Sequence, residues 1–209
     1  MTTLLLIRHG TTAATGKRLG GRTGAELDEG GVQQAKAAGE RIADLPVKAV
    51  YASPLTRTWQ TAEHVAAPFK LPVREAEGLL EVDYGRWTDR TLAQVSRTRR
   101  WKVVQSTPSL TVFPEGESIR GAQARATDEV ERLVAAHRRQ VIAAVSHADV
   151  IKAIVAFYLG QPLDLFQRLV IDPGSVTILD LGVGVRPALT RFNDNGGLDG
   201  AAYRRSARG

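Results

Sequence analysis

The chain has 209 residues, 43% of them apolar, and a formal net charge of +6 at pH 7. This length and apolar content predict one domain with a well-buried core. The chain contains no cysteine, which excludes disulfides, thiolate catalysis and cysteine-ligated zinc. No window of about 18 apolar residues could span a membrane, and the N-terminus lacks a signal-peptide pattern, so we expect a cytoplasmic protein without a membrane partner.

The excess of positive charge fits either nucleic acid or an anionic small molecule as partner. The arginines are scattered along the chain rather than gathered in one helix or arm, which favours an anionic pocket over nucleic acid. A stretch rich in Gly, Asn and Asp from Asn193 to Gly200 precedes a basic end. We therefore expect one domain over residues 1–193 and a flexible tail over residues 194–209.

The first buried strand is predicted at residues 4–7, where four apolar residues follow one another without polar alternation. Arg8, His9 and Gly10 come directly after it, at the edge where open α/β sheets place their ligand crevice. The guanidinium of Arg8 suits a phosphate or carboxylate, and His9 can act as a nucleophile if a neighbour holds its second ring nitrogen. The alternative interpretation is a surface arginine beside a structural histidine.

Alternating strand and helix patterns fill the rest of the chain, after a basic loop over residues 11–27. The expected elements are a helix over 28–45, a strand over 48–53, a helix over 54–67, an edge strand over 71–75, helices over 91–102 and 117–137, a strand over 141–145, a helix over 150–159, a helix followed by a strand over 165–171, and strands over 175–181 and 187–192. This order predicts a three-layer α/β/α sandwich whose central sheet is mostly parallel with an antiparallel edge strand.

Two further side chains on this path suit phosphate chemistry. Arg57 lies in the first turn of the helix after the second strand, near the same crevice. Glu81 follows two leucines, and apolar surroundings raise a carboxyl pKa towards that of a useful general acid. Taken singly, arginine and glutamate are more often solvated surface residues. His64 and His137 are expected at the surface.

The strand over 141–145 also ends in a histidine, within the sequence Ser146-His147-Ala148. A helix begins directly afterwards, so His147 and the following backbone amides lie at a helix N-terminus, which favours anions. If the strands that end in His9 and His147 are neighbours, both imidazoles face one crevice.

Five segments can be compared with a known family. They are Leu-Ile-Arg-His-Gly-Thr at 6–11, Tyr-Ala-Ser-Pro-Leu-Thr-Arg-Thr-Trp-Gln-Thr-Ala at 51–62, Leu-Glu-Val-Asp-Tyr-Gly-Arg-Trp at 80–87, Pro-Glu-Gly-Glu-Ser at 114–118 and Val-Ser-His-Ala-Asp-Val-Ile at 145–151. Together they resemble the motifs of the histidine phosphatase superfamily, also called the phosphoglycerate mutase-like family. The chain is similar to its short phosphatase branch, particularly to actinobacterial phosphatase or phosphomutase proteins.

The resemblance implies that His9 is the nucleophile that becomes phosphorylated, and that Arg8, Arg57 and His147 bind the phosphoryl oxygens. It also implies that Glu81 protonates the leaving oxygen and then activates water. Such a set of donors stabilises the charge of phosphoryl transfer. No metal and no cofactor are expected.

Four residues expected to bind the substrate depart from the usual family pattern. Thr15 replaces an asparagine but can still donate one hydrogen bond. Gly21 and Arg22 replace a Gln-Gly pair, and the arginine adds a cation. Ala148 replaces a glycine but supplies the same backbone amide. These changes bear on specificity rather than on the core reaction.

The sequence therefore predicts a metal-independent phosphatase that hydrolyses small phosphate monoesters through a phosphohistidine. A mutase of the phosphoglycerate mutase type is the lesser alternative, because only 65 residues separate Glu81 from His147 and mutases usually carry a longer insertion there. A module that binds a phospho-ligand without turnover is another alternative, although binding alone does not require a proton donor. The sequence leaves the oligomeric state open, a homodimer included.

Substrate choice is expected to depend on residues 11–24 and on an excursion over residues 82–116. Their basic side chains lead us to hypothesise a substrate with a second anionic group, against the alternative that most of them are solvated. These side chains are Arg18, Arg22, Arg86, Arg90, Arg97, Arg99, Arg100 and Lys102.

Overall fold

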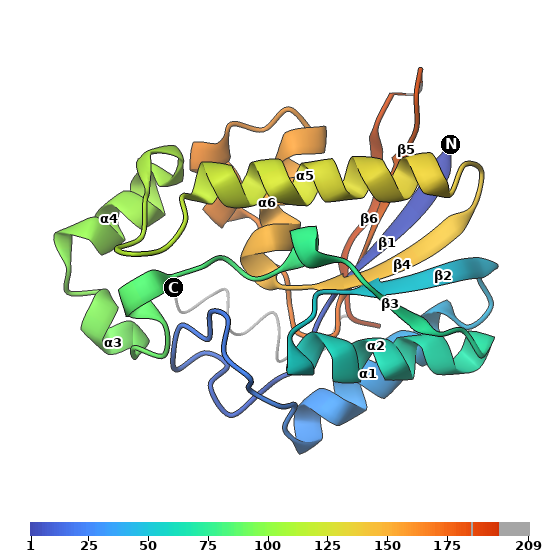
Figure 1. Cartoon of the computed structure of the whole chain (residues 1–209), viewed down its shortest axis with the longest axis horizontal. Helices are drawn as coiled ribbons and strands as arrows, with labels where there is room; N and C mark the ends of the chain where they lie inside the picture. Colours follow the sequence, from blue (N-terminus) through green and yellow to red (C-terminus); the bar gives the residue numbers. More distant parts are fainter. Residues whose placement is uncertain (185, 197–209) are drawn as a thin grey trace.

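The computed structural model describes residues 1–184 and 186–196. Within them, the strands form one six-stranded sheet in the order β3-β2-β4-β1-β5-β6 (Figure 1). The strands are β1 (Thr2–Arg8), β2 (Val47–Ala52), β3 (Val73–Glu75), β4 (Val141–Ser146), β5 (Val176–Leu181) and β6 (Ala188–Asp194). The pairings among the first four strands are parallel, whereas β5 runs antiparallel to both β1 and β6. The predicted mostly parallel sheet is confirmed. Its antiparallel pairings are the two that β5 forms, with β1 and with the edge strand β6.

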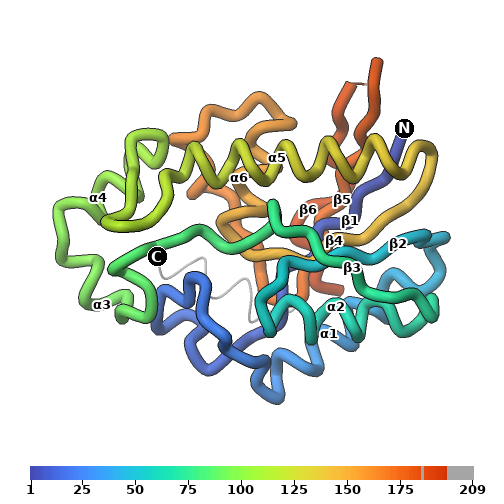
Figure 2. The backbone as a smooth tube through the Cα atoms, viewed as in Figure 1, coloured from blue at the N-terminus to red at the C-terminus, as the bar shows by residue number. Residues whose placement is uncertain are grey.

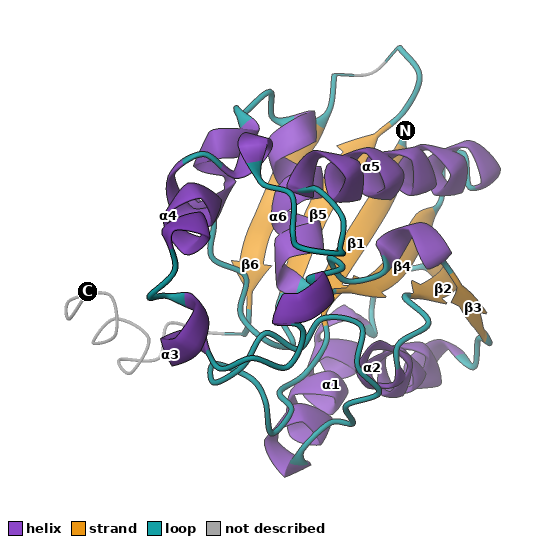
Figure 3. Cartoon of the chain, turned by 60° about the vertical axis from the view of Figure 1, so that its left-hand side comes forward, coloured by secondary structure: helices purple, strands orange, loops and turns teal. Residues whose placement is uncertain are grey.

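Helices cover both faces of this sheet (Figures 1 and 3). On one face lie α1 (Glu29–Ile42) and α2 (Thr56–Ala66), and on the other lie α5 (Ile119–Ala136) and α6 (Ala148–Tyr158). The predicted three-layer sandwich is confirmed. No helix in the described ranges has the length and apolar character needed to cross a membrane.

Strand β1 is buried on both of its faces, as its unbroken apolar run predicts. Leu5 and Ile7 belong to the apolar cluster beneath α1 and α2, whereas Leu4 and Leu6 belong to the cluster beneath α5 and α6. Each of the four is 0% exposed. Burial of a side chain of this size is worth about 1.5–3 kcal/mol, so the strand anchors the residues at its carboxyl end firmly.

The turn after β1 packs directly against the start of α1. Asp28 caps this helix as predicted, because its Oδ1 accepts a hydrogen bond from the backbone N–H of Gly31 at 2.7 Å. A Cβ on Gly10 would lie 2.2 Å from the carbonyl oxygen of Gly31. Only glycine permits this approach, which fixes the chain immediately after His9.

The prediction of one continuous helix over 91–102 is wrong. Two short helices occupy this region, α3 (Leu92–Val95) and α4 (Arg99–Ser106). Thr91 and Thr98 each cap one of them, with Oγ1 accepting at 3.2 Å from a backbone N–H three residues later. The second cap starts a new helix where the periodicity alone suggested one continuous helix.

The basic loop over residues 11–27 is bound to this excursion by main-chain hydrogen bonds. The N–H of Leu19 donates to the carbonyl of Arg90 at 3.0 Å, and the N–H of Leu92 donates to the carbonyl of Lys17 at 2.9 Å. The two segments expected to govern substrate choice therefore lie side by side, beyond the end of the sheet (Figure 2).

The C-terminal part differs from the prediction within residues 165–171. A 3₁₀ helix spans Leu163–Arg168 and the residues after it are irregular, so the expected strand does not form. The carbonyl of Ile171 instead accepts a hydrogen bond from the Arg8 side chain. Asp194 is the last residue of β6, and residues 197–209 of the predicted tail lie outside the described residues.

Candidate active site

His9 and His147 follow two neighbouring parallel strands. Arg8 lies opposite Ser146 in the β1–β4 register, and the next residue of each strand is a histidine. The two ring centroids lie 5.1 Å apart with an interplanar angle of 63°. The two strands are neighbours and bring the imidazoles together, and the side chains are 6% and 0% exposed.

Arg57 contacts both imidazoles from the first turn of α2. Its Nε donates to Nε2 of His9 at 3.2 Å, and its Nη2 lies 3.2 Å from Nδ1 of His147. Further guanidinium bonds go to the carbonyls of Gly21 at 2.8 Å and Thr23 at 3.1 Å. These two carbonyls of the basic loop hold the buried guanidinium against both rings.

The partners of each ring indicate which nitrogen carries the proton. Nδ1 of His9 lies 2.7 Å from the carbonyl of Gly10, which can only accept, so this nitrogen is protonated and Nε2 keeps its lone pair. Nδ1 of His147 faces a guanidinium, which can only donate, so the proton of that ring lies on Nε2, 2.9 Å from Oγ of Ser53. Nε2 of His9 is therefore the ring nitrogen that keeps a lone pair.

Both imidazoles are neutral at pH 7. Burial lowers the pKa of His9 and of His147 well below the ordinary value, and the nearby cation of Arg57 lowers both further. A neutral ring retains the lone pair that nucleophilic attack requires.

Arg8 supplies a second guanidinium to the same edge of the sheet. Its Nη1 donates to the carbonyl of Ile171 at 2.5 Å, whereas its buried Nε has no hydrogen-bond partner among the described residues. A buried donor of this kind fits an anion that can accept from it. Ala148 is the first residue of α6, so its backbone amide has no partner within the helix and favours an anion.

Glu81 lies close to these cations but is not paired with them. Its Oε1 accepts from the N–H of Val82 at 2.9 Å, and its Oε2 lies 3.9 Å from Nδ1 of His147. The pKa of this carboxyl is raised to about 7; burial is the largest cause, the carboxylate of Asp149 adds to the rise, and the cation of Arg57 opposes it. The direction is the one that the preceding leucines predict.

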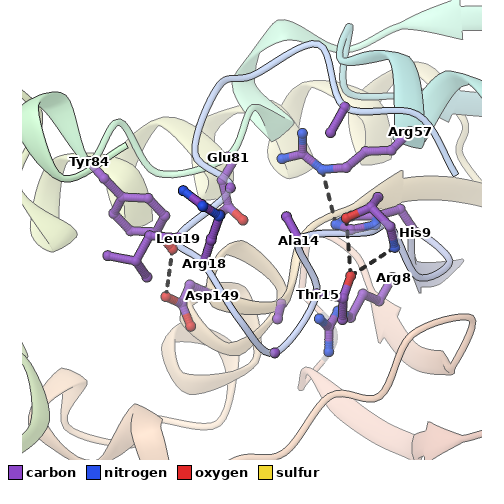
Figure 4. A pocket seen from close by; sticks show the side chains of 15 residues that line it. Arg8, His9, Ala14, Thr15, Arg18, Leu19, Arg57, Glu81, Tyr84 and Asp149 are labelled. Carbon is purple, nitrogen blue, oxygen red and sulfur yellow. Dashed lines mark hydrogen bonds between the residues drawn. The ribbon is translucent and has the colours of Figure 1, made fainter. Parts of the chain in front are cut away.

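These groups meet at a cavity of about 150 Å³ at the carboxyl ends of β1 and β4 (Figure 4). Arg8, His9, Arg57 and Glu81 line it, and Figure 4 shows Glu81 on the opposite side from His9. Pockets for drug-sized ligands measure about 300–1,000 Å³, so this cavity favours a small ligand. His147 is fully buried and does not line the cavity itself.

A family model described as the histidine phosphatase superfamily (branch 1) matches residues 4–195. The chain belongs to this superfamily. Phosphoserine phosphatase 1 of Hydrogenobacter thermophilus is 27% identical over 187 residues, covering 87% of each chain. A probable phosphoglycerate mutase of Erwinia tasmaniensis is 29% identical, over 86% of this chain and 85% of its own. The solved structure of a mutant phosphoserine phosphatase from Entamoeba histolytica with phosphoserine has a TM-score of 0.85 at 27% identity, covering 95% of this chain and 100% of that one.

The four predicted substrate-binding residues of this histidine phosphatase fall into two groups. Thr15 and Ala148 line the cavity. Gly21 and Arg22 lie outside its lining: the carbonyl of Gly21 holds the guanidinium described above, and Arg22 forms an ion pair with Glu117 at 3.2 Å. Among the other basic side chains of the second-anion hypothesis, Arg18 lines the cavity.

Sequence reasoning missed one anionic residue of the cavity, Asp149. Its Oδ2 accepts from the hydroxyl of Tyr84 at 3.0 Å, and its Oδ1 accepts from Nζ of Lys152 at 3.2 Å. An aspartate in the first turn of a helix is commonly explained by the helix dipole alone. The sequence therefore contained no signal that distinguishes Asp149 from an ordinary first-turn aspartate.

The other two histidines of this histidine phosphatase lie outside the cavity. His64 and His137 are partly exposed, as expected, and Nε2 of His137 lies 2.8 Å from the hydroxyl of Tyr51. Among the described residues, no group of three or more His, Asp or Glu side chains is arranged to hold a metal ion.

Proposed function

We propose that this histidine phosphatase hydrolyses small phosphate monoesters through a phosphohistidine formed on Nε2 of His9. The observation that carries the proposal is the state of this ring. Nδ1 is engaged by the carbonyl of Gly10, Nε2 keeps its lone pair beside Arg57, and burial keeps the imidazole neutral.

In the first step, Nε2 of His9 attacks phosphorus and the bond from phosphorus to the ester oxygen breaks. Arg8 and Arg57 bind the phosphoryl oxygens and stabilise their charge. Glu81, on the opposite side of the cavity, gives its proton to the departing oxygen, which leaves as an alcohol. Attack and departure on opposite sides suit an in-line transfer.

In the second step, a water molecule attacks the phosphohistidine and the bond from phosphorus to nitrogen breaks. Glu81, now a carboxylate, takes the proton of that water and returns to its acid form as inorganic phosphate is released. The pKa of about 7 supports both roles, because the acid and base forms are equally populated near neutral pH.

His147 has an indirect role in this proposal. The family resemblance assigns it direct contact with the phosphoryl group, but the ring is 0% exposed and its Nδ1 faces Nη2 of Arg57 at 3.2 Å. We therefore assign it the task of orienting that guanidinium, with Ser53 fixing its tautomer. The cytoplasmic location and the lack of a nucleic-acid partner stay predictions from the sequence, and the oligomeric state stays open.

The test is phosphate release from a panel of monoesters in the presence of EDTA. The panel contains p-nitrophenyl phosphate, phosphoserine, phosphoglycerates, sugar phosphates and nucleotides. Release that survives EDTA, is lost in His9→Ala and persists in His64→Ala would support the proposal, because His64 lies outside the cavity. Isomerisation of phosphoglycerate that requires added bisphosphate, without hydrolysis, would identify a mutase. Binding of phosphate esters without turnover would identify a binding module.

A further inference from the structure

Glu81 lies on a segment without regular secondary structure, so its position needs another explanation. We call residues 78–83 the acid loop; it begins within the 3₁₀ helix Glu77–Leu79 and ends before another at Gly85–Trp87. The carboxyl of Glu81 forms its one hydrogen bond within the described residues to the N–H of Val82, inside the same loop. The position of the Glu81 carboxyl therefore depends on the contacts that fix the backbone of the acid loop.

Two arginines bind that backbone from outside the loop. Nη2 of Arg125 and Nε of Arg22 each donate to the carbonyl of Glu81 at 3.1 Å. Nη1 of Arg125 also donates to the carbonyl of Gly78 at 2.8 Å. One guanidinium thus binds the start of the acid loop and the acidic residue itself.

The carboxylate of Glu117 joins these contacts into one network. Its Oε1 accepts from the N–H of Asp83 at 2.8 Å, and it forms a two-point ion pair with Arg125, from Nη2 at 2.7 Å and from Nε at 3.0 Å. Burial opposes the charge of Glu117, but the hydrogen bonds from Arg125 and Asp83 outweigh it and lower its pKa. Glu117 therefore stays ionised and holds the end of the acid loop.

The acid loop packs closely against α5, the helix that carries Arg125. A Cβ on Gly78 would lie 2.4 Å from Cβ of Glu129 and 2.8 Å from the carbonyl oxygen of Arg125, both on α5. A Cβ on Gly116 would lie 2.3 Å from the carbonyl oxygen of Asp83. The Pro-Glu-Gly-Glu-Ser segment at 114–118 thus supplies both the anion and the glycine that bind the acid loop.

We propose that Arg125 is a positioning residue, which holds the carboxyl of Glu81 within reach of the leaving-group oxygen by binding the acid-loop backbone and Glu117. The inference rests on the proposed role of Glu81 as general acid. Arg125 lies on α5, a helix of 18 residues, and its side chain is 23% exposed, against 35% for Arg22. Arg22 belongs to the loop that holds Arg57, so it links that loop to the acid loop in the same network.

The test compares two esters that differ in their need for a proton. p-Nitrophenolate leaves readily as an anion, whereas the alkoxide of phosphoserine requires protonation. General acid catalysis contributes about 10²–10⁴-fold, so Arg125→Ala should lower kcat/KM for phosphoserine by roughly tenfold or more beyond its effect on p-nitrophenyl phosphate. Arg125→Lys should restore part of the loss, and added guanidinium ion should restore part of it in Arg125→Ala.

Arg132→Ala is the matched control, since Arg132 also lies on α5 and pairs with a glutamate, Glu129, but does not contact the acid loop. It should leave the ratio of the two kcat/KM values unchanged. An equal loss for both esters in Arg125→Ala, or the same change in the ratio in Arg132→Ala, would overturn the positioning role.

A second measurement does not depend on activity, so it separates failure of this inference from failure of the proposed function. The titration of the Glu81 carboxyl, followed by ¹³C NMR and assigned with Glu81→Gln, should have its midpoint near pH 7 in the wild type. In Arg125→Ala, displacement towards solvent should lower this pKa towards the ordinary value, whereas Arg132→Ala should not change it. An unchanged titration in Arg125→Ala would contradict the inference even if the protein hydrolysed no ester.

Discussion

Raising the pH from 7 to about 9 should slow cleavage of alkyl phosphate esters about 50-fold. A carboxyl whose pKa is about 7 is half protonated at pH 7 but only about 1% protonated at pH 9, and the acid form of Glu81 is the one that donates. At the ordinary value of 4.5 only about 0.3% would be protonated at pH 7. Burial in the cavity therefore increases the population of the proton donor by roughly 150-fold at that pH.

The assay is kcat/KM against pH for phosphoserine and for p-nitrophenyl phosphate, because this ratio reports the first phosphoryl transfer. The phosphoserine profile should have a basic limb centred near pH 7, and Glu81→Gln should remove that limb. Glu77→Gln, a neighbouring exposed glutamate, should leave it in place. A limb of equal size for both esters would refute the reasoning, since p-nitrophenolate needs no proton.

Three further outcomes follow from the same geometry. Asp149→Asn should move the basic limb to lower pH, since the Asp149 carboxylate raises the pKa of Glu81; a limb that stays in place would exclude this coupling. Glu81→Gln should increase the free energy of unfolding at pH 8 by up to about 3 kcal/mol, and less at pH 5, in denaturant titrations. A folded-state pKa above the unfolded value contributes stability below about pH 4.5 that is lost as the pH rises through 7, and glutamine avoids this loss. Gly10→Ala should destabilise the fold by about 1–3 kcal/mol because of its contact with Gly31, whereas Gly24→Ala, with open space around it, should cost less.

The central sheet and the paired histidines could be predicted because local signals and global topology agree there. The apolar runs before His9 and His147 can be buried on both faces only in a parallel sheet flanked by helices, and the carboxyl ends of such strands share one edge. Near residues 91–102 the signals conflicted, since Thr98 lies in an apparently helical stretch and caps a new helix. The predicted strand near Ile171 fails because its carbonyl binds Arg8, a long-range contact that periodicity does not encode.

The residues of the site could be predicted where the chemistry of the side chain itself indicated a role. The predicted residues Arg8, His9, Arg57 and Glu81 line the cavity. The role proposed for Arg125 could not be anticipated, because the arginine acts through backbone carbonyls that lie 44 and 47 residues away in the sequence, and such contacts leave no local pattern.

The central place of β1 in the sheet has a consequence for how the nascent chain matures. Thr3 of this first strand pairs with Val141 on one side and Asp180 on the other, so both partners are synthesised long after it. Contacts of such sequence separation form slowly, and an unpaired apolar strand invites aggregation meanwhile. The two histidines can therefore meet only after most of the chain has left the ribosome, and appearance of the His9–His147 contact would serve as a late marker of folding.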